Sequence, residues 1–320
     1  MKQPKTLGAT ACAALLLPVC ALAQDVVIPD PNYASGRATA FAVKAIIEEA
    51  LGLEVGMITT TAVPVIFEAM ARGNGEIDIW TETWLPNQSA PVSKYIEQEG
   101  KVVLGEPFFE AAQGYCVTSV TATEHGITSV FDLANPENAK LFDTNGDGKG
   151  EIWIGGQGWQ STNTEQVRAR DYGFADFFEL QAVDEAIATA GLAEAAKANR
   201  PWVGYCYSPH QNFAMYDLTF LEEPPHDPEQ FKMVQPAEDP DWMAKSYVAS
   251  AYAPTTVHNS WSANLAERQP ALVPLLERIQ LSADDVNAWA RAIVDGGDPE
   301  TLTRDWVKAN PEKIAEWMAQ

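Results

Sequence analysis

Short apolar runs that alternate with amphipathic segments constrain the fold of this chain most strongly. Residues 26–29, 53–58 and 77–80 have the composition of buried strands, and residues 38–51 and 62–72 between them have the spacing of amphipathic helices. Alternation of this kind predicts an α/β fold with largely parallel sheets. Further helices are expected at residues 127–133, 164–178, 184–199, 262–267, 271–279, 282–295 and 299–308.

Residues 1–23 have the features of an export signal. Lys2 and Lys5 give it a positive start, residues 10–19 form a short apolar core, and an Ala-Leu-Ala cleavage site closes it. The apolar core is too short to span a bilayer. Cys20 would suggest lipidation, but the Pro-Val pair before it makes a poor lipobox. We therefore expect a soluble protein that is exported, periplasmic or secreted, and without a lipid anchor.

Acidic residues outnumber basic ones by a wide margin. The chain has 44 Asp and Glu residues against 21 Lys and Arg residues, which gives a net charge of −23. A field of this sign repels nucleic acid and anionic membranes and attracts cations. Adaptation to a salty environment would produce the same composition, and both explanations stand. About 300 residues remain after the signal, enough for two modest domains or one large one.

Two cysteines, Cys116 and Cys206, remain once the signal is removed. Each lies in an apolar, strand-like run. In an oxidising compartment the two are able to form a disulfide, whereas two buried free thiols fit the pattern equally well. The sequence leaves both alternatives open.

A glycine-rich turn at residues 155–162 follows the apolar strand 151–154 and precedes a helical segment. Its glycines allow the backbone to turn sharply and to approach a ligand closely. The first amides of the helix, around Gln160 and Ser161, lack intrahelical partners and lie at its positive end, which suits an oxyanion. Trp159 adds an indole face that suits a cation. The alternative is an ordinary strand-to-helix turn whose tryptophan packs on the sheet.

Aromatic residues also follow three other predicted strands. Glu82 and Trp84 lie in a predicted loop after the third strand, Tyr33 follows the first strand, and Tyr207 ends a later one. Because ligands of α/β sheets bind beyond the carboxyl ends of the strands, we expect these side chains to meet Trp159. Electron-rich rings around one point form a cage for a quaternary ammonium group, at roughly 0.5–2 kcal/mol per contact. Such a cage, with hydrogen bonds to an oxygen, predicts roughly micromolar affinity.

Residues 112–115 (Ala-Gln-Gly-Tyr), residues 139–149 and the pair Gly158-Trp159 carry a family resemblance. They are similar to the glycine betaine-binding proteins of ABC importers, the ProX/OpuAC type, and the likeness extends over the mature chain. The resemblance implies a two-lobed periplasmic binding protein, type II-like, that holds its ligand in a cleft between two α/β lobes. We expect one lobe at residues 25–112 with 254–320 and the other at residues 113–253.

The resemblance also implies which residues bind the ligand. Trp84 and Trp159 match tryptophans of the aromatic box, and Tyr207 stands where relatives have a third tryptophan. The amides of Gln160 and Ser161 match those that hold the ligand carboxylate. Trp84 and Tyr33 are expected on one side of the ligand, with Trp159 and Tyr207 on the other.

Departures from the family pattern weaken the expected hold on a carboxylate. Gln88 replaces a histidine that assists the carboxylate, and the disulfide that flanks the box tryptophan is missing. A ligand with a smaller oxygen end, trimethylamine N-oxide, is therefore as good a candidate as glycine betaine, with choline and carnitine behind them. Glu82 is placed to accept a choline hydroxyl or to bind through water, and the alternative for it is a solvated loop acid.

The loop at residues 143–151 resembles the first nine positions of an EF-hand. Ile154 occupies the twelfth position, where an EF-hand has glutamate, so the alternative is a loop whose turns are closed by its own side chains. We expect no required cofactor, and a bound Ca²⁺ would only stiffen the approach to Trp159. The candidate metal ligands are Asp143, Asn145, Asp147, Lys149 and Glu151.

Motifs of common enzyme classes are missing from the sequence. It contains no G-x-S-x-G, no H-E-x-x-H and no phosphate-binding loop, and its four histidines are scattered. Cys206 and His210 suggest a thiol nucleophile, but Cys206 lies in an apolar alternation typical of a packed strand. We therefore expect a monomeric binding protein, not an enzyme, that delivers its ligand to an ABC permease. The alternative is a periplasmic sensor or receptor subunit for the same ligand class.

Overall fold

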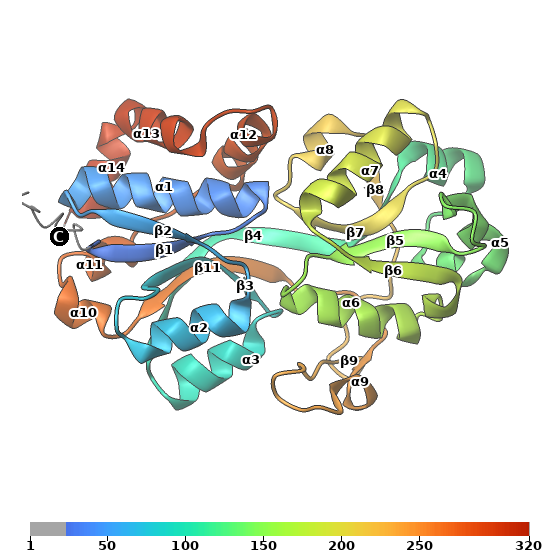
Figure 1. The fold of residues 1–320 in the computed structure, drawn as a ribbon, viewed down its shortest axis with the longest axis horizontal. Helices are drawn as coiled ribbons and strands as arrows, with labels where there is room; N and C mark the ends of the chain where they lie inside the picture. Colours follow the sequence, from blue (N-terminus) through green and yellow to red (C-terminus); the bar gives the residue numbers. More distant parts are fainter. Residues whose placement is uncertain (1–23, 320) are drawn as a thin grey trace, which may run out of the picture.

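A long strand joins two lobes that lie side by side (Figure 1). The computed structural model describes residues 24–319. Strand β4 (Val102–Thr118) runs from one lobe into the other. Its residues up to Ala111 pair with β11 (Thr255–Ser262), and the rest of it pairs with β7 (Val203–Ser208). This is the two-lobed α/β arrangement expected from the sequence.

The first lobe combines the beginning and the end of the chain. Strands β1 (Val26–Asp30) and β2 (Val55–Thr59) form a parallel pair, and β3 (Ile79–Leu85) pairs with β11. Helix α1 (Ala34–Leu51) ends at Gly52, whose φ of 65° is left-handed and favours glycine. The other helical elements are α2 (Val63–Arg72), α3 (Ser89–Val92), a π-helical turn (Ser93–Gln98), α10 (Leu265–Arg268), α11 (Val273–Leu276), α12 (Ala283–Val294), α13 (Pro299–Ala309) and α14 (Pro311–Met318).

The second lobe holds the middle of the chain. Strand β5 (Gly150–Gly155) lies between β6 (Phe178–Ala182) and β7, and helices α6 (Gln160–Asp171) and α7 (Glu185–Lys197) flank them (Figure 1). The remaining α-helices and strands are short. They are α4 (Ser119–His125), α5 (Pro136–Ala139), α8 (Asn212–Met215), β8 (Leu218–Phe220), β9 (Phe231–Lys232), α9 (Trp242–Lys245) and β10 (Tyr247–Val248).

The main sheet is mixed, so the expectation of largely parallel sheets is wrong. Its strand order is β3-β11-β4-β7-β5-β6, with β8 also paired to β4. Strand β5 is parallel to β6 and β7, but β4 is antiparallel to β11, β7 and β8. Strands β4 and β11 are antiparallel because β4 carries the chain out of the first lobe and β11 carries it back beside β4.

Two elements next to the cleft differ from their predicted bounds. Strand β3 continues to Leu85, so the stretch predicted as a loop after residue 80 is part of the sheet. Helix α6 begins at Gln160 and ends at Asp171, whereas residues 164–178 were predicted. The helix stops early because Gly173 has a φ of 83°, and Phe178 already belongs to β6.

The helix predictions elsewhere have mixed outcomes. The helix predicted at 127–133 is wrong, since α4 ends before it and residues Val130–Ala134 form a 3₁₀ turn. Residues 262–267 and 271–279 contain only the short α10 and α11, and α14 was not predicted. Helices α12 and α13 are confirmed, and the Ser282 side chain caps α12 by accepting a hydrogen bond from the Asp285 amide.

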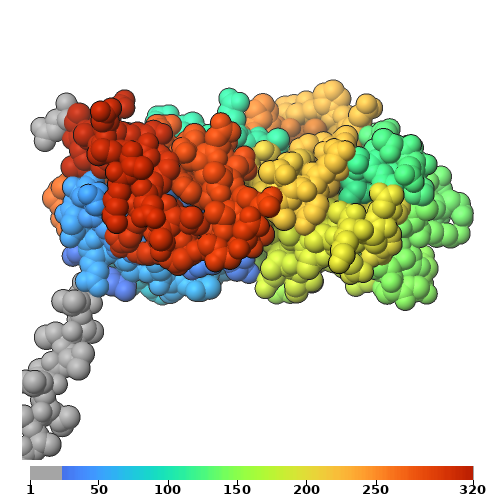
Figure 2. Space-filling model, turned by 90° about the horizontal axis from the view of Figure 1, so that it is seen from above, coloured from blue at the N-terminus to red at the C-terminus, as the bar shows by residue number. Residues whose placement is uncertain are grey.

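Each lobe has its own apolar core. In the first lobe, Ile46 and Trp289 belong to a cluster between α1 and the C-terminal helices, which cover one face of this lobe in Figure 2. In the second lobe, Ile152 and Phe174 belong to another. A further cluster of mainly aromatic residues lies between the two cores. Its buried members are Trp84, Trp153, Tyr205, Tyr207, Tyr252 and Val257.

Cys116 and Cys206 form a disulfide, which decides between the two alternatives that the sequence left open. The bond joins β4 to β7, with 5.7 Å between the two Cα atoms. It therefore ties the second-lobe half of β4 to the strand that carries Tyr207.

No helix within residues 24–319 is both long and apolar enough to cross a membrane. The predicted signal, residues 1–23, lies outside the described residues.

Candidate ligand-binding site

A cavity lined by residues of both lobes lies at the aromatic cluster. Its volume of about 50 Å³ exceeds the roughly 10–15 Å³ that one water molecule needs. None of the side chains that line it carries a formal charge at neutral pH. From the first lobe these are Tyr33, Thr61, Val63, Trp80, Trp84, Asn87 and Gln88, and from the second they are Trp159, Gln160, Ser161, Tyr205 and Tyr207.

Four aromatic rings form adjoining walls of this cavity. The ring centroids of Tyr33 and Trp159 are 5.0 Å apart, those of Trp159 and Tyr207 are 6.0 Å apart, and those of Trp84 and Tyr207 are 5.4 Å apart. The angles between these ring planes are 71°, 77° and 85°. The neighbouring rings meet edge to face and do not stack, and all four of these aromatic residues line the one cavity.

Strand β3 puts three important side chains on the same face of the sheet. Successive strand residues point to opposite faces, so Trp80, Glu82 and Trp84 point to one side. All three are buried, and Trp80 and Trp84 line the cavity. A loop, as predicted from the sequence, would not have fixed this common direction.

Glu82 lies behind the aromatic walls and is not among the residues that line the cavity. Its Oε2 accepts hydrogen bonds from the Trp84 indole at 2.8 Å and from the Tyr33 hydroxyl at 3.1 Å, and its Oε1 accepts one from Thr39 at 2.6 Å. Burial raises the pKa of Glu82 to about 7, although these three donors act in the opposite direction. The alternative of a solvated loop acid is therefore wrong.

The beginning of α6 lies at the wall of the cavity. Gly155 and Gly158 have φ values of 117° and 83°, which favour glycine and allow the sharp turn before the helix. Trp159 is the N-cap residue and supplies no side-chain cap, and the first turn contains no acidic residue. Gln160 and Ser161 follow it, are buried and line the cavity. This end of α6 is therefore able to attract a ligand atom that carries a partial negative charge.

A second buried carboxylate, Glu185, stands behind Tyr207. The Tyr207 hydroxyl donates a hydrogen bond to it, and the His210 Nε2 lies 3.3 Å from it. Burial alone would raise the pKa of Glu185, but the charge of His210 and the donors around the carboxylate outweigh burial and lower it. Glu185 therefore has an imidazole beside it, whereas Glu82 accepts hydrogen bonds only from an indole and two hydroxyls.

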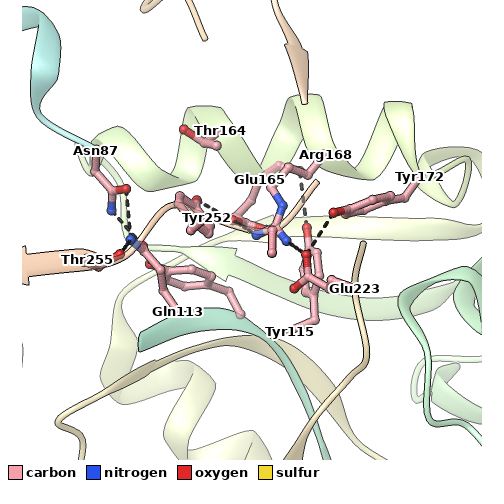
Figure 3. A network of polar contacts seen from close by, with 12 residues as sticks. Asn87, Gln113, Tyr115, Thr164, Glu165, Arg168, Tyr172, Glu223, Tyr252 and Thr255 are labelled. Carbon is pink, nitrogen blue, oxygen red and sulfur yellow. Dashed lines mark hydrogen bonds and ion pairs between the residues drawn. The ribbon is translucent and has the colours of Figure 1, made fainter. Parts of the chain in front are cut away.

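A polar cluster joins the cavity to the point where β4 changes lobes (Figure 3). The Asn87 and Gln113 side chains form a reciprocal amide pair with distances of 2.8 and 3.1 Å. Gln113 also donates to Thr255 at 2.8 Å and accepts from the Tyr205 hydroxyl at 2.7 Å. Asn87 and Tyr205 line the cavity from different lobes, so Gln113 connects both walls to the crossing strand.

A buried arginine of α6 ties this helix to neighbouring parts of the second lobe (Figure 3). Arg168 is fully buried and forms ion pairs with Glu165 at 2.9 Å and with Glu223. Its guanidinium carbon lies 5.1, 5.5 and 4.7 Å from the ring centroids of three tyrosines. The nearest of these, Tyr252, also donates to Glu165 at 2.6 Å. The tyrosines are Tyr115, Tyr172 and Tyr252.

Comparison with known proteins identifies the family. The substrate-binding domain of ABC-type glycine betaine transport systems, OpuAC, matches residues 24–309. The chain belongs to the OpuAC family. As a member of this family it is a substrate-binding protein of an ABC transport system, and its relatives are transport proteins and not enzymes.

Individual relatives agree with this assignment. The chain is 25% identical over 283 residues to the glycine betaine/proline betaine-binding periplasmic protein of Escherichia coli K12, which covers 84% of this chain and 82% of the relative. Lactococcal OpuAC, in its closed form with glycine betaine, has a TM-score of 0.70 at 21% identity and covers 92% of this chain and 99% of its own. A choline-binding protein in complex with choline has a TM-score of 0.70 at 22% identity and covers 92% and 91%. The two structures establish the OpuAC fold.

Some cavity residues of this OpuAC-family protein were not among the main predicted ligand contacts. Trp80, Asn87 and Tyr205 line the cavity, together with Gln88. Gln88 accepts a hydrogen bond from the Trp80 indole at 3.3 Å and donates one to the Glu82 carbonyl oxygen at 2.8 Å. The family resemblance in the sequence marked Gln88 as a position where relatives have histidine. In the structure its two hydrogen bonds hold the Trp80 side chain and the β3 backbone together.

The predicted calcium loop brings three carboxylates together. Oxygens of Asp143, Asp147 and Glu151 lie within 4.8 Å of one another. The Asp143 carboxylate accepts from the amides of Gly146 and Gly148, and these bonds lower its pKa. The Asn145 and Asp147 side chains accept from the amides of Asp147 and Lys149 at 2.8 Å. The loop therefore has the turns that the alternative predicted, together with a carboxylate cluster.

Proposed function

We propose that this OpuAC-family protein captures a small trimethylammonium-type osmolyte, glycine betaine or trimethylamine N-oxide, in the aromatic box between its lobes. The observation that carries the proposal is the set of four rings from both lobes around one uncharged cavity. A methylated nitrogen spreads its charge over its methyl groups, so it gains both cation–π attraction and apolar contact in such a box. Choline and carnitine are less favoured ligands.

The oxygen end of the ligand is proposed to lie at the beginning of α6. Gln160 and Ser161 line the cavity at this helix end, where the first amides lack intrahelical partners, and Asn87 and Gln88 line it as well. The lining contains no Lys, Arg or His to pair with a full carboxylate. A compact N-oxide oxygen needs fewer donors than a carboxylate, which keeps trimethylamine N-oxide equal to glycine betaine as a candidate.

We propose that closure of two lobes, residues 25–112 with 254–320 and residues 113–253, signals that ligand is bound. The change of strand partner after Ala111 supports this division. The Asn32 side chain donates to Asp184 across the cleft at 3.0 Å, and Tyr33 contacts Trp159. A ligand that touches both walls would favour this closed arrangement over an open one.

The site of action is proposed to be the periplasm. The named relative is periplasmic, and the predicted export signal agrees with that location. We propose that the protein works as a monomer and delivers its ligand to an ABC permease.

Calorimetric titration of the purified protein tests the proposed ligand class. Glycine betaine, trimethylamine N-oxide, choline, carnitine and dimethylsulfoniopropionate are titrated under one set of conditions. We expect the first two to bind with roughly micromolar affinity. No heat with any of the five ligands would reject the proposed function.

We also propose that the loop at residues 143–151 binds Ca²⁺ through its three carboxylates. Besides their proximity, the Oε1 atom of Glu151 is buried and has no hydrogen-bond partner among the described residues. A hard cation with oxygen ligands would satisfy this atom. Asn145 and the Lys149 carbonyl are the remaining candidate ligands, and the ion would have no part in holding the osmolyte.

Thermal unfolding with and without a chelator tests the calcium site. Ca²⁺ at a hundredfold excess over its Kd should stabilise the protein by about 2.7 kcal/mol and raise its Tm. Glu151→Gln should remove this shift. A Tm that is the same in Ca²⁺ and in chelator would contradict the proposal.

A further inference from the structure

Three of the four aromatic side chains that form the cavity walls donate a hydrogen bond to a buried carboxylate. Trp84 and Tyr33 donate to Glu82, and Tyr207 donates to Glu185. Both carboxylates are almost completely buried, and neither lines the cavity. The two acids therefore act on the cavity through the rings.

A hydrogen bond from an aromatic side chain to a carboxylate has two effects. It fixes the rotation of the ring, because the N–H or O–H must point at the acceptor. It also draws the proton toward the carboxylate and leaves more electron density on the ring, which strengthens the attraction of the ring face for a cation. Trp84, Tyr33 and Tyr207 are placed to benefit from both effects.

The two carboxylates differ in their own partners. Glu185 has the His210 imidazole beside it, with Nε2 at 3.3 Å, as well as the Tyr207 hydroxyl. Glu82 has only the neutral donors of Trp84, Tyr33 and Thr39, and no cationic side chain of residues 24–319 forms a salt bridge with it. A buried carboxylate without a counter-charge is costly unless a cation arrives nearby.

We propose that Glu82 is a positioning and charge-selecting residue of the aromatic box. Its carboxylate holds Tyr33 and Trp84 in place, and its uncompensated charge makes the box favour a charged quaternary nitrogen over a neutral group of the same shape. The inference rests on the proposed function, since it assumes that the box receives the methylated end of the ligand.

Matched ligand pairs separate charge from shape. 3,3-Dimethylbutan-1-ol has the shape of choline, and 3,3-dimethylbutanoate has the shape of glycine betaine, with carbon in place of the charged nitrogen. The ratio of the two Kd values in each pair measures how strongly the protein prefers the charged centre. Glu82→Gln should reduce this preference about tenfold, because it removes the nearby charge and keeps the side-chain shape. Asp78→Asn, which replaces another buried acid just before β3, should leave the preference unchanged.

A purely structural role of Glu82 would give a different result. Glu82→Gln would then weaken both members of each pair by the same factor, and that outcome would overturn the proposal. Glu82→Asp, which keeps a carboxylate, should retain most of the preference even if overall affinity falls. Binding of no trimethylammonium ligand by the wild-type protein would instead reject the proposed function itself.

The wild-type protein offers a further readout that needs no substitution. The groups that face Glu82 are the hydroxyls of Tyr33 and Thr39, the Trp84 indole and, at longer range, the Glu185 carboxylate of α7 with its partner His210. Because burial raises the pKa of Glu82 to about 7, protonation should weaken the preference for the charged nitrogen as the pH falls through this value. In Glu82→Gln the preference should not change over the same range, and an identical pH profile in both proteins would contradict the proposal.

Discussion

Trp159→Ala should raise the Kd for glycine betaine or trimethylamine N-oxide more than about tenfold, because it removes one wall of the box. Trp159 is the ring that joins the walls of the two lobes, since it lies against Tyr33 and against Tyr207. The substitution removes cation–π attraction, apolar contact and part of the closed interface together. The indole is only half-buried, so the fold should survive its loss.

Calorimetry on the variant measures this effect, and Trp242→Ala is the matched control. Trp242 is also a half-buried tryptophan, but it begins the short helix α9 and does not line the cavity. The Trp242→Ala variant should bind the ligand with the same Kd as the wild-type protein. An unchanged Kd in Trp159→Ala would reject the role assigned to this ring.

Arg168→Met should lower the free energy of unfolding by about 3–5 kcal/mol, because it leaves two buried carboxylates without their counter-charge. Glu165 and Glu223 both pair with this one guanidinium, and three tyrosine rings surround it. Burial already raises the pKa of Glu165 despite the arginine. Its folded pKa should rise further in the variant, so the loss of stability should grow as the pH rises above the usual pKa of a glutamate.

Urea unfolding of the variants measures this loss. Arg200→Met removes a half-exposed ion pair with Glu194 and should cost less than about 1 kcal/mol. Adding Glu165→Gln and Glu223→Gln to Arg168→Met should recover part of the stability, because the uncompensated charges are then gone. A variant Arg168→Met as stable as the wild-type protein would contradict this account of the network.

Local sequence patterns were sufficient to predict those structural features that depend only on neighbouring residues. Gly52 ends α1 and Ser282 caps α12, and these residue types favour such positions in any helix. The four box aromatics follow strand ends or lie near them, so the tendency of α/β proteins to bind ligands there was enough to group them. The sequence reading and the structure agree on which rings meet.

Features that depend on distant parts of the chain could not be read in the same way. The direction of β4 relative to β11 depends on residues more than 100 positions apart, so the mixed sheet was missed. The extension of β3 to Leu85 depends on the same pairing, because β11 supplies its partner. Polar residues in a row, such as Thr81 to Thr83, indicate a loop until such a partner is known.

Glu82 illustrates the same limit at the level of one side chain. Its three hydrogen-bond donors come from the loop before α1, from α1 and from β3. Nothing in its immediate sequence indicates that it is buried, and a solvated acid was the more common expectation for its residue type. Its place behind the box follows only from the packing of α1 against β3.

The most direct test of the aromatic box is the NMR resonance of the ligand methyl groups. Glycine betaine and trimethylamine N-oxide with ¹³C-labelled N-methyl groups are added to the protein until binding is saturated. Methyl protons that lie over the faces of several rings are shielded by the ring currents, so we expect the bound resonance to move upfield from that of the free ligand. The shift should shrink in Trp159→Ala. A bound ligand whose methyl resonance stays at its free position would contradict the claim that these rings enclose the methylated nitrogen.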